Sequence, residues 1–259
     1  MLTLYEFEQT NELMIAAHRG SSGTITENTL AAFADAIASG VKLIELDIQV
    51  TADNKLVVYH DFYLPDFENR IPELTYDEIK EIQIGPDLNG SFDSSHIPLL
   101  QDVIDLVMGK CYLMIEIKVN SDVKFFENLD KLVDMIIEKN YFMNTIVGSF
   151  NYESLRKIKS MNSSIYTAAI KLPGDVRLPS QVREDTGCDA FICSIDEIND
   201  DIDEDTLKNK IFTGVYTVDD EDSLKIALKH NVRAIATNYP DKILKLLSKI
   251  IPDKKYNSG

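Results

Sequence analysis

The stretch that decides the fold runs from Ile44 to Asp61 and reads I-E-L-D-I-Q-V-T-A-D-N-K-L-V-V-Y-H-D. Its first half alternates as a strand does, so apolar side chains take one face while Glu45 and Asp47 share the other. Two like charges on an otherwise apolar strand are unfavourable unless a positive group lies between them, and a divalent cation meets that need. The T-A-D-N turn that follows predicts a tight hairpin, which sets Asp47 roughly opposite His60.

The same stretch has a plainer interpretation. A half-exposed strand whose polar face meets water, with His60 as an ordinary surface residue, is compatible with the same letters. The rest of the chain favours the cation site, because it supplies further groups of the same chemistry.

Composition describes a globular chain with a strong negative charge. Its 259 residues suit a single α/β barrel, and the net charge of −17 argues against binding nucleic acid or anchoring stably to an anionic membrane. The three cysteines lie in apolar runs and fit no zinc pattern, which indicates reduced core thiols. The acidic N-terminus has no signal-peptide pattern and no stretch reaches the length of a membrane span, so a cytoplasmic location is expected.

Short apolar runs alternate with amphipathic segments along the chain. Strands are predicted at 13–17, 44–50, 111–118, 145–149, 165–170, 190–194, 211–218 and 232–237. Helices are predicted after an N-cap at Asn28 and at 76–82, 101–108, 125–139, 152–161, 220–230 and 241–250. If 56–60 is the return arm of the hairpin, eight parallel strands remain. That is the number in a (β/α)8 TIM barrel, so the chain is expected to be one catalytic barrel domain spanning residues 1–259.

The segment 61–98 has a mixed character and is interrupted by four prolines. A segment of this length between barrel elements is usually functional or a small subdomain. We interpret it as a lid-like insertion after the second strand, and its composition does not say what it recognises.

Barrel enzymes carry their chemistry at the C-terminal ends of the strands. The first predicted strand ends in His18 and Arg19, and in the strand 111–118 Glu116 and Lys118 share one face and point into the barrel. Three carboxylates are thus expected at the barrel mouth, namely Glu45, Asp47 and Glu116. Such an oxygen-rich site is the kind that Mg²⁺ or Ca²⁺ prefers. The alternative is that Glu116 and Lys118 form an internal ion pair that fills the barrel top.

A series of motifs extends from about residue 14 to residue 241: A-H-R-G, E-N-T-L-A-A-F, the opening stretch, I-P-L-L, I-E-I-K, V-G-S-F, V-Y-T-V-D and A-T-N-Y-P-D. In order and spacing this series resembles the glycerophosphodiester phosphodiesterase family. The resemblance implies a metal-dependent hydrolase on a phospholipase-C-like barrel that converts glycerophosphodiesters into glycerol 3-phosphate and an alcohol. It also implies roles for the site residues: His18 and His60 as the acid/base pair, Glu45, Asp47 and Glu116 as metal ligands, and Arg19 and Lys118 as phosphate contacts.

The chain departs from the family pattern in places. The run F-Y-L-P-D-F-E-N-R follows H-D where the family usually has a Leu-, Arg- and Thr-rich run, which puts substrate preference in question. The family's W-T-V-N is similar to the sequence from Tyr216 to Asp219, so an aromatic wall is kept while an amide becomes a carboxylate. Ligand contacts at Asp219 are therefore expected to differ.

Phosphodiester hydrolysis needs a neutralised phosphoryl group, an activated nucleophile and a protonated leaving alkoxide. Two histidines with ordinary pKa values near ~6.5 suit the proton transfers, and the sequence assigns neither the base nor the acid. Direct hydrolysis and a cyclic phosphate intermediate both stay open. Ser149 ends a strand, where its hydroxyl either contacts substrate or serves the turn. His96 and His230 are expected to take no part in the chemistry.

Two rival functions stay open. A lysophospholipase-D-like or sphingomyelinase-D-like activity needs an apolar mouth, which aromatic residues of the insertion can supply: Phe62, Tyr63, Phe67 and Phe92. The other rival is a non-catalytic ligand-binding barrel. It is disfavoured because every proposed chemical position is occupied by a suitable residue.

Overall fold

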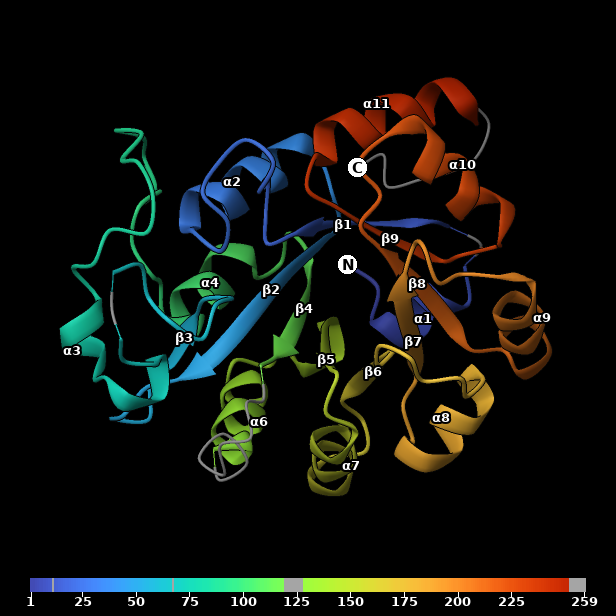
Figure 1. Cartoon of the computed structure of the whole chain (residues 1–259), viewed down its shortest axis with the longest axis horizontal. Coiled ribbons are helices and arrows are strands. Elements are labelled where there is room, and N and C mark those ends of the chain that lie inside the picture. The colour runs from blue at the N-terminus through green and yellow to red at the C-terminus, as the bar shows by residue number, and fades with distance from the viewer. Residues whose placement is uncertain (11, 67, 119–127, 252–259) are drawn as a thin grey trace.

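The computed structural model describes residues 1–10, 12–66, 68–118 and 128–251. Its sheet runs in the order β1-β9-β8-β7-β6-β5-β4-β2, and β1 also pairs with β2, which closes eight parallel strands into a barrel. Helices surround the strands (Figure 1). The predicted (β/α)8 fold is therefore confirmed.

The parallel strands of the barrel are β1 (Met14–His18), β2 (Leu43–Val50), β4 (Tyr112–Ile117), β5 (Thr145–Ser149), β6 (Tyr166–Ile170), β7 (Ala190–Ser194), β8 (Phe212–Tyr216) and β9 (Ala234–Thr237). The outer helices are α2 (Leu30–Ser39), α4 (Leu100–Val107), α6 (Leu129–Glu138), α7 (Tyr152–Met161), α8 (Pro179–Thr186), α9 (Asp200–Asn209), α10 (Glu221–Lys229) and α11 (Pro240–Ile250). A 3₁₀ turn, η2 (Phe142–Asn144), leads into β5. Residues 125–127 of the helix predicted at 125–139 lie outside the described residues.

The hairpin forms as predicted, with β3 (Leu56–Val58) antiparallel to β2. Ile48 pairs with Val58, and the backbone N–H of Tyr59 donates to the carbonyl of Asp47 at 3.0 Å. His60 is thus one residue beyond the position opposite Asp47. This register brings His60 alongside the part of β2 that carries Glu45 and Asp47.

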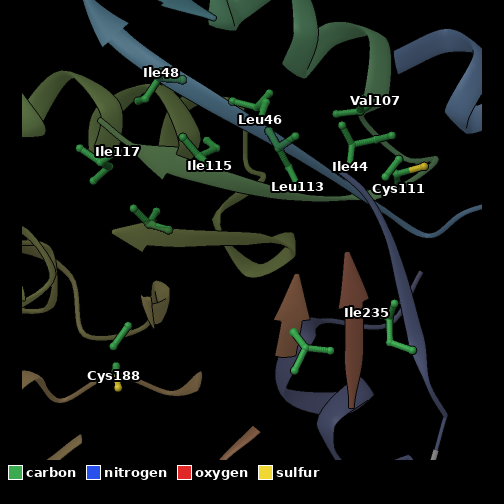
Figure 2. Packing of buried hydrophobic residues seen from close by; sticks show 14 of the residues in the cluster. Ile44, Leu46, Ile48, Val107, Cys111, Leu113, Ile115, Ile117, Cys188 and Ile235 are labelled. Atoms are coloured by element: carbon green, nitrogen blue, oxygen red, sulfur yellow. The ribbon is translucent and has the colours of Figure 1, made fainter. Parts of the chain in front are cut away.

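Two apolar layers enclose the strands of the barrel. On β2, Ile44, Leu46 and Ile48 point outward and pack in the layer beneath the helices, next to β4 (Figure 2). The inner layer contains Leu43 and residues of the other strands, and α1 (Leu4–Glu8) covers its lower end with Leu4 and Phe7. The barrel interior is apolar at the end that α1 covers. The inward polar side chains of β2 lie toward the opposite end, where the strands have their carboxyl termini.

The start of α2 differs from the prediction. The N-cap is Thr29, whose hydroxyl accepts a hydrogen bond from the backbone N–H of Ala32, and the C-cap is Gly40. Asn28 instead has a positive φ of 58° and donates from its side chain to Asp47 Oδ2 at 2.9 Å. The contact with Asp47 engages Asn28, so the next residue, Thr29, takes the cap.

The segment 61–98 lies at one side of the barrel beside β3, at the left of Figure 1. It contains η1 (Ile71–Glu73) and α3 (Tyr76–Ile79). A small apolar cluster attaches it to Val57 of β3 through Leu64, Ile71, Ile79 and Ile97. Phe67, one of the aromatic residues considered for an apolar mouth, lies outside the described residues. Within the described ranges, no helix is long and apolar enough to cross a membrane.

Candidate active site

A cavity of about 360 Å³ lies at the carboxyl ends of the strands. Seven of the residues singled out from the sequence line it, namely His18, Arg19, Glu45, His60, Glu116, Lys118 and Tyr216. Asp47 is fully buried. It contacts two of the lining residues, Lys118 and Arg19, so it lies directly behind the cavity wall. The strand ends therefore bring the predicted carboxylates, cations and histidines together.

Three carboxylates form the buried acidic cluster of the site, namely Glu45, Asp47 and Glu116. Each offers an oxygen within 4.8 Å of the others, because Asp47 on β2 stands in register with Glu116 on β4. Burial and the charges of Asp47 and Glu116 raise the pKa of Glu45 well above its usual value. Against its burial, Lys118 and Arg19 hold the pKa of Asp47 below its usual value.

Lys118 stands between two of these carboxylates. Its Nζ lies 2.5 Å from Glu116 Oε1 and 3.0 Å from Asp47 Oδ1. The internal ion pair considered as an alternative for Glu116 and Lys118 is therefore present. Despite the burial of Lys118, the charges of Asp47 and Glu116 raise its pKa, so the side chain is held as an ammonium group.

The oxygen ligands that the acidic cluster offers fit a hard cation. All three groups offer oxygen, and Asp47 Oδ1 and Glu116 Oε1 are buried without a partner in hydrogen-bond geometry, although Lys118 is within ion-pair distance of both. Mg²⁺ and Ca²⁺ take such oxygen ligands. The cluster can hold a divalent metal ion.

Arg19 links the acidic cluster to the loop that precedes α2. Its backbone N–H donates to Glu45 Oε2 at 2.9 Å, its Nε lies 3.2 Å from Asp47 Oδ2, and its Nη1 bonds to both carboxylate oxygens of Glu27, at 2.9 and 3.1 Å. The following residue, Gly20, has a φ of +80°, and a Cβ there would lie 2.7 Å from the Ala32 backbone. This close turn against α2 keeps Arg19 at the cavity wall.

The two histidines lie in different settings. The Nδ1 of His18 is 2.7 Å from Asn238 Oδ1, and its Nε2 is 4.0 Å from Glu45 Oε2. Burial and the charge of Arg19 lower the pKa of His18. The Nδ1 of His60 is 2.7 Å from Asp61 Oδ1. Both residues line the cavity.

Ser149 and Tyr216, the remaining predicted contacts, differ in position. Tyr216 lines the cavity, and burial together with the charge of Glu116 raises its pKa to about 12, so the phenol stays protonated. Ser149 is fully buried, donates to the Ile117 carbonyl at 3.2 Å and accepts from the Asn151 N–H at 3.0 Å. The structure does not bring the Ser149 hydroxyl into the cavity, because it serves the turn after β5.

Sequence reasoning missed several polar partners of the site: Glu27, Asn28, Asp61 and Asn238. Glu27 and Asn28 belong to the motif E-N-T-L-A-A-F, and Asn238 to A-T-N-Y-P-D, so the motifs contained the signal. The pairing of each residue depends on contacts between distant segments, such as the 220 positions that separate His18 from Asn238.

A closed parallel barrel with carboxylates, histidines and cations at the carboxyl ends of its strands is the arrangement of a barrel enzyme. The sequence model of the glycerophosphoryl diester phosphodiesterase family matches residues 18–242. A glycerophosphodiester phosphodiesterase from Caldanaerobacter subterraneus subsp. tengcongensis is 30% identical over 245 residues, which cover 91% of this chain and 98% of that protein. The chain therefore belongs to the glycerophosphoryl diester phosphodiesterase family, which confirms the family and the class of enzyme expected from the sequence.

Solved structures share the fold. A crystal structure from Silicibacter pomeroyi DSS-3 matches with a TM-score of 0.83 at 21% identity and covers 92% of this chain and 94% of that chain. A phosphodiesterase from Oleispira antarctica, solved in complex with the product sn-glycerol-3-phosphate, has a TM-score of 0.80 at 22% identity, with 94% of this chain and 98% of that chain covered. At these identities the likeness shows the barrel fold alone.

Proposed function

We propose that this protein hydrolyses glycerophosphodiesters to glycerol 3-phosphate and an alcohol, using a divalent cation and the pair His18 and His60. The observation that carries the proposal is that both imidazole rings line the same cavity as Glu45 and Glu116 of the buried acidic cluster. A positive charge for the phosphoryl group and two proton-transfer groups are then available at one site. The glycerol 3-phosphate bound by the related Oleispira antarctica enzyme supports the assignment of the product.

Glu45, Asp47 and Glu116 would hold the cation, either Mg²⁺ or Ca²⁺. When bound, such a cation neutralises phosphoryl charge and acts as a Lewis acid on a phosphoryl oxygen. Arg19 and Lys118 line the same cavity, and we infer that they contact the phosphate from the protein side. The Arg19 fork suits a planar contact with two phosphoryl oxygens, while Lys118 acts as a point charge.

The two histidines carry the protons. One imidazole takes a proton from the attacking oxygen as the new P–O bond forms, and the other gives a proton to the leaving alcohol oxygen as the old P–O bond breaks. The attacking oxygen is that of water in direct hydrolysis, or the substrate's own glycerol hydroxyl in the cyclic route, where water then opens the cyclic phosphate by the reverse proton transfers. His18 is held by Asn238 and His60 by Asp61, so both rings are oriented before substrate arrives. The two proton transfers balance, because each turnover returns one proton from the base to the acid through solvent.

The apolar part of the cavity wall suits the carbon skeleton of the substrate. It contains Phe150, Ile170, Ile192 and Tyr216. We infer that this wall contacts the glycerol moiety, and that the segment 61–98 acts as a lid within a single catalytic domain. His60 lines the cavity one residue before this segment begins, so movement of the segment would change access to the cavity.

The direct test is an assay for glycerol 3-phosphate released from a water-soluble glycerophosphodiester, with Mg²⁺ or Ca²⁺ added after exhaustive chelation. We expect release that depends on the added metal and is lost in Asp47→Asn, because Asp47 is both a proposed ligand and the partner of Lys118 and Arg19. Release that persists undiminished after chelation would exclude the proposed metal role. No release from any such diester would exclude the proposed activity.

A lysolipid substrate is the second candidate. Two aromatic side chains of the insertion are exposed, with Tyr63 at 54% and Phe92 at 44%, and they give the segment an apolar surface. The same assay with a lysophospholipid separates the two functions. Faster release of the head-group alcohol from the lysolipid than from the soluble diester would favour this candidate over our proposal.

A further inference from the structure

The side chain of Asn238 connects His18 to Asp219, which lies in the loop after β8. Asn238 Oδ1 is 2.7 Å from His18 Nδ1, and Asn238 Nδ2 donates to Asp219 Oδ2 at 2.6 Å. The other carboxylate oxygen, Asp219 Oδ1, accepts from the backbone N–H of Asn238 at 2.8 Å and from the hydroxyl of Thr237 at 2.9 Å. Both oxygens of Asp219 are therefore engaged by the segment that faces His18.

The chemistry of these groups fixes the direction of each bond. A carboxylate accepts and does not donate, so the amide nitrogen of Asn238 must face Asp219. Its oxygen then faces His18, and the hydroxyl of Ser22 lies 2.9 Å from it, with its one hydrogen shared between this oxygen and the His18 carbonyl at 2.7 Å. An oxygen acceptor 2.7 Å from His18 Nδ1 requires a hydrogen on that nitrogen. The unprotonated nitrogen of the neutral His18 ring is therefore Nε2.

We propose that Asp219 is a positioning residue that acts through Asn238 to fix the tautomer of His18, so that every proton His18 takes or gives during the reaction passes through Nε2. The proposal rests on the proposed role of His18 in proton transfer. Nδ1–H donates to Asn238 in both the neutral and the protonated ring, so the bond persists through the cycle and nothing has to rearrange.

Asp219 and Asn238 do not belong to the lining of the cavity, unlike His18. The position where the family pattern has an amide thus holds a carboxylate that acts behind the histidine. A purely structural role for Asp219 would consist of tying the loop after β8 to the loop after β9. Its backbone carbonyl already ties the loop after β8 to α11, which follows the loop after β9, because Lys242 Nζ donates to it at 2.7 Å, and side-chain substitutions leave this bond in place.

The single substitution Asp219→Asn replaces one accepting carboxylate oxygen with a donating amide nitrogen. The new Oδ1 keeps its two donors, the Asn238 N–H and the Thr237 hydroxyl, so the new Nδ2 faces Asn238 Nδ2 and two donors meet. Turning the Asn238 amide relieves this conflict, but its nitrogen then faces His18, whose Nδ1 must become an acceptor. We expect the His18 hydrogen to move to Nε2.

The double substitution Asp219→Asn/Asn238→Asp restores every bond. The carboxylate at 238 accepts from His18 Nδ1 and from Ser22, and its second oxygen accepts from the new amide at 219. The new amide oxygen still accepts from Thr237 and from the backbone N–H of residue 238. We therefore expect the exchanged pair to return the Nδ1–H tautomer that the single substitution removes.

The experiment is ¹⁵N NMR of the histidine rings at a pH where His18 is neutral, combined with steady-state kinetics. Only four histidines have to be assigned, and His18→Gln identifies the His18 signals. We expect the parent and the exchanged pair to show a protonated-type shift at Nδ1, and Asp219→Asn to show it at Nε2. Asp222→Asn, an exposed carboxylate-to-amide change on α10, is the matched control and should leave the His18 shifts unchanged.

The kinetic arm asks whether the tautomer matters. We expect Asp219→Asn to lower kcat by about 10²-fold with little change in KM, and the exchanged pair to recover most of that loss. An unaltered Nδ1–H tautomer in Asp219→Asn would overturn the proposal, as would a switched tautomer with unchanged kcat. An exchanged pair that regains the tautomer but not the activity would also overturn it. Because the NMR shifts need no turnover, failure of the tautomer lock is distinguishable from failure of the proposed hydrolysis.

Discussion

The ammonium nitrogen of Lys118 lies 3.0 Å from Oδ1 of Asp47, behind the wall of the cavity. The same nitrogen lies 2.5 Å from Glu116, so one cation serves two carboxylates. Glu45 receives the backbone N–H of Arg19 instead, and its pKa is raised by burial and by the other two carboxylates. Full ionisation of the three carboxylates therefore needs more positive charge than Lys118 and Arg19 together supply, and a divalent cation would provide it.

Divalent cations should stabilise the parent protein through this cluster. Binding of a ligand to the native state alone adds about 2.7 kcal/mol to the free energy of unfolding at a concentration of 100 Kd, so Tm should rise with added Mg²⁺ or Ca²⁺. In Glu116→Gln the rise should be strongly reduced, whereas Glu184→Gln, an exposed change on α8, should keep it. Thermal unfolding at graded metal concentrations measures this, and an equal Tm rise in both variants would place the metal elsewhere.

Without metal, Glu45 should make stability fall as pH rises. Its folded-state pKa is raised above the ordinary 4.5, so its favourable contribution is complete below about pH 4.5 and is lost as pH rises toward the folded value. The slope is about 1.4 kcal/mol per pH unit between the two pKa values. Asp47 acts in the opposite direction, because its lowered pKa gives stability that is lost as pH falls through the folded value.

Glu45→Gln should remove this decline. We expect the variant, after chelation, to have a higher free energy of unfolding than the parent at neutral pH and to lose the metal response. Urea denaturation at a series of pH values measures both effects, with Glu138→Gln on α6 as an exposed control. A metal-free Glu45→Gln protein less stable than the parent at neutral pH would show that the carboxylate is a structural requirement.

Arg19→Lys should lower kcat/KM by about tenfold or more. Lysine keeps the charge but loses the fork that reaches Asp47 through Nε and Glu27 through Nη1, and with it any two-point contact to a phosphate. Arg156→Lys is the matched control, because Arg156 is a surface residue whose partner is Asp185. Parent-like kinetics in Arg19→Lys would mean that Arg19 serves packing and that the phosphate contact lies elsewhere.

The barrel and the acidic cluster are predictable because they follow from strand periodicity. The alternation around Glu45 and Asp47 fixes which side chains face inward, and β2 is buried along its whole length as that reading requires. Glu116 follows from the same rule on β4. Because the barrel strands are parallel, their carboxyl ends meet at one mouth of the barrel, whatever sequence lies between them.

The polar partners of the site are not predictable in this way. Asn28 has the local pattern of an N-cap, yet its contact is with Asp47, and Thr29 takes the cap. Ser149 has a hydroxyl at a strand end, and the same local pattern serves either a turn or a ligand. The bond between His18 and Asn238 joins the two ends of the barrel sequence, and only closure of β1 onto β9 brings them together.

The most direct test of the account compares two substrates in the parent, His18→Ala and His60→Ala: a glycerophosphodiester with an alkyl alcohol leaving group, and one with 4-nitrophenol, which leaves without protonation. On the alkyl ester each variant should lose on the order of 10²-fold or more in kcat, the usual scale for a positioned proton donor or acceptor. The nitrophenyl ester should rescue one variant only, and that variant identifies the acid. Equal rescue of both, or a loss of no more than a few-fold on the alkyl ester, would contradict acid/base catalysis by His18 and His60.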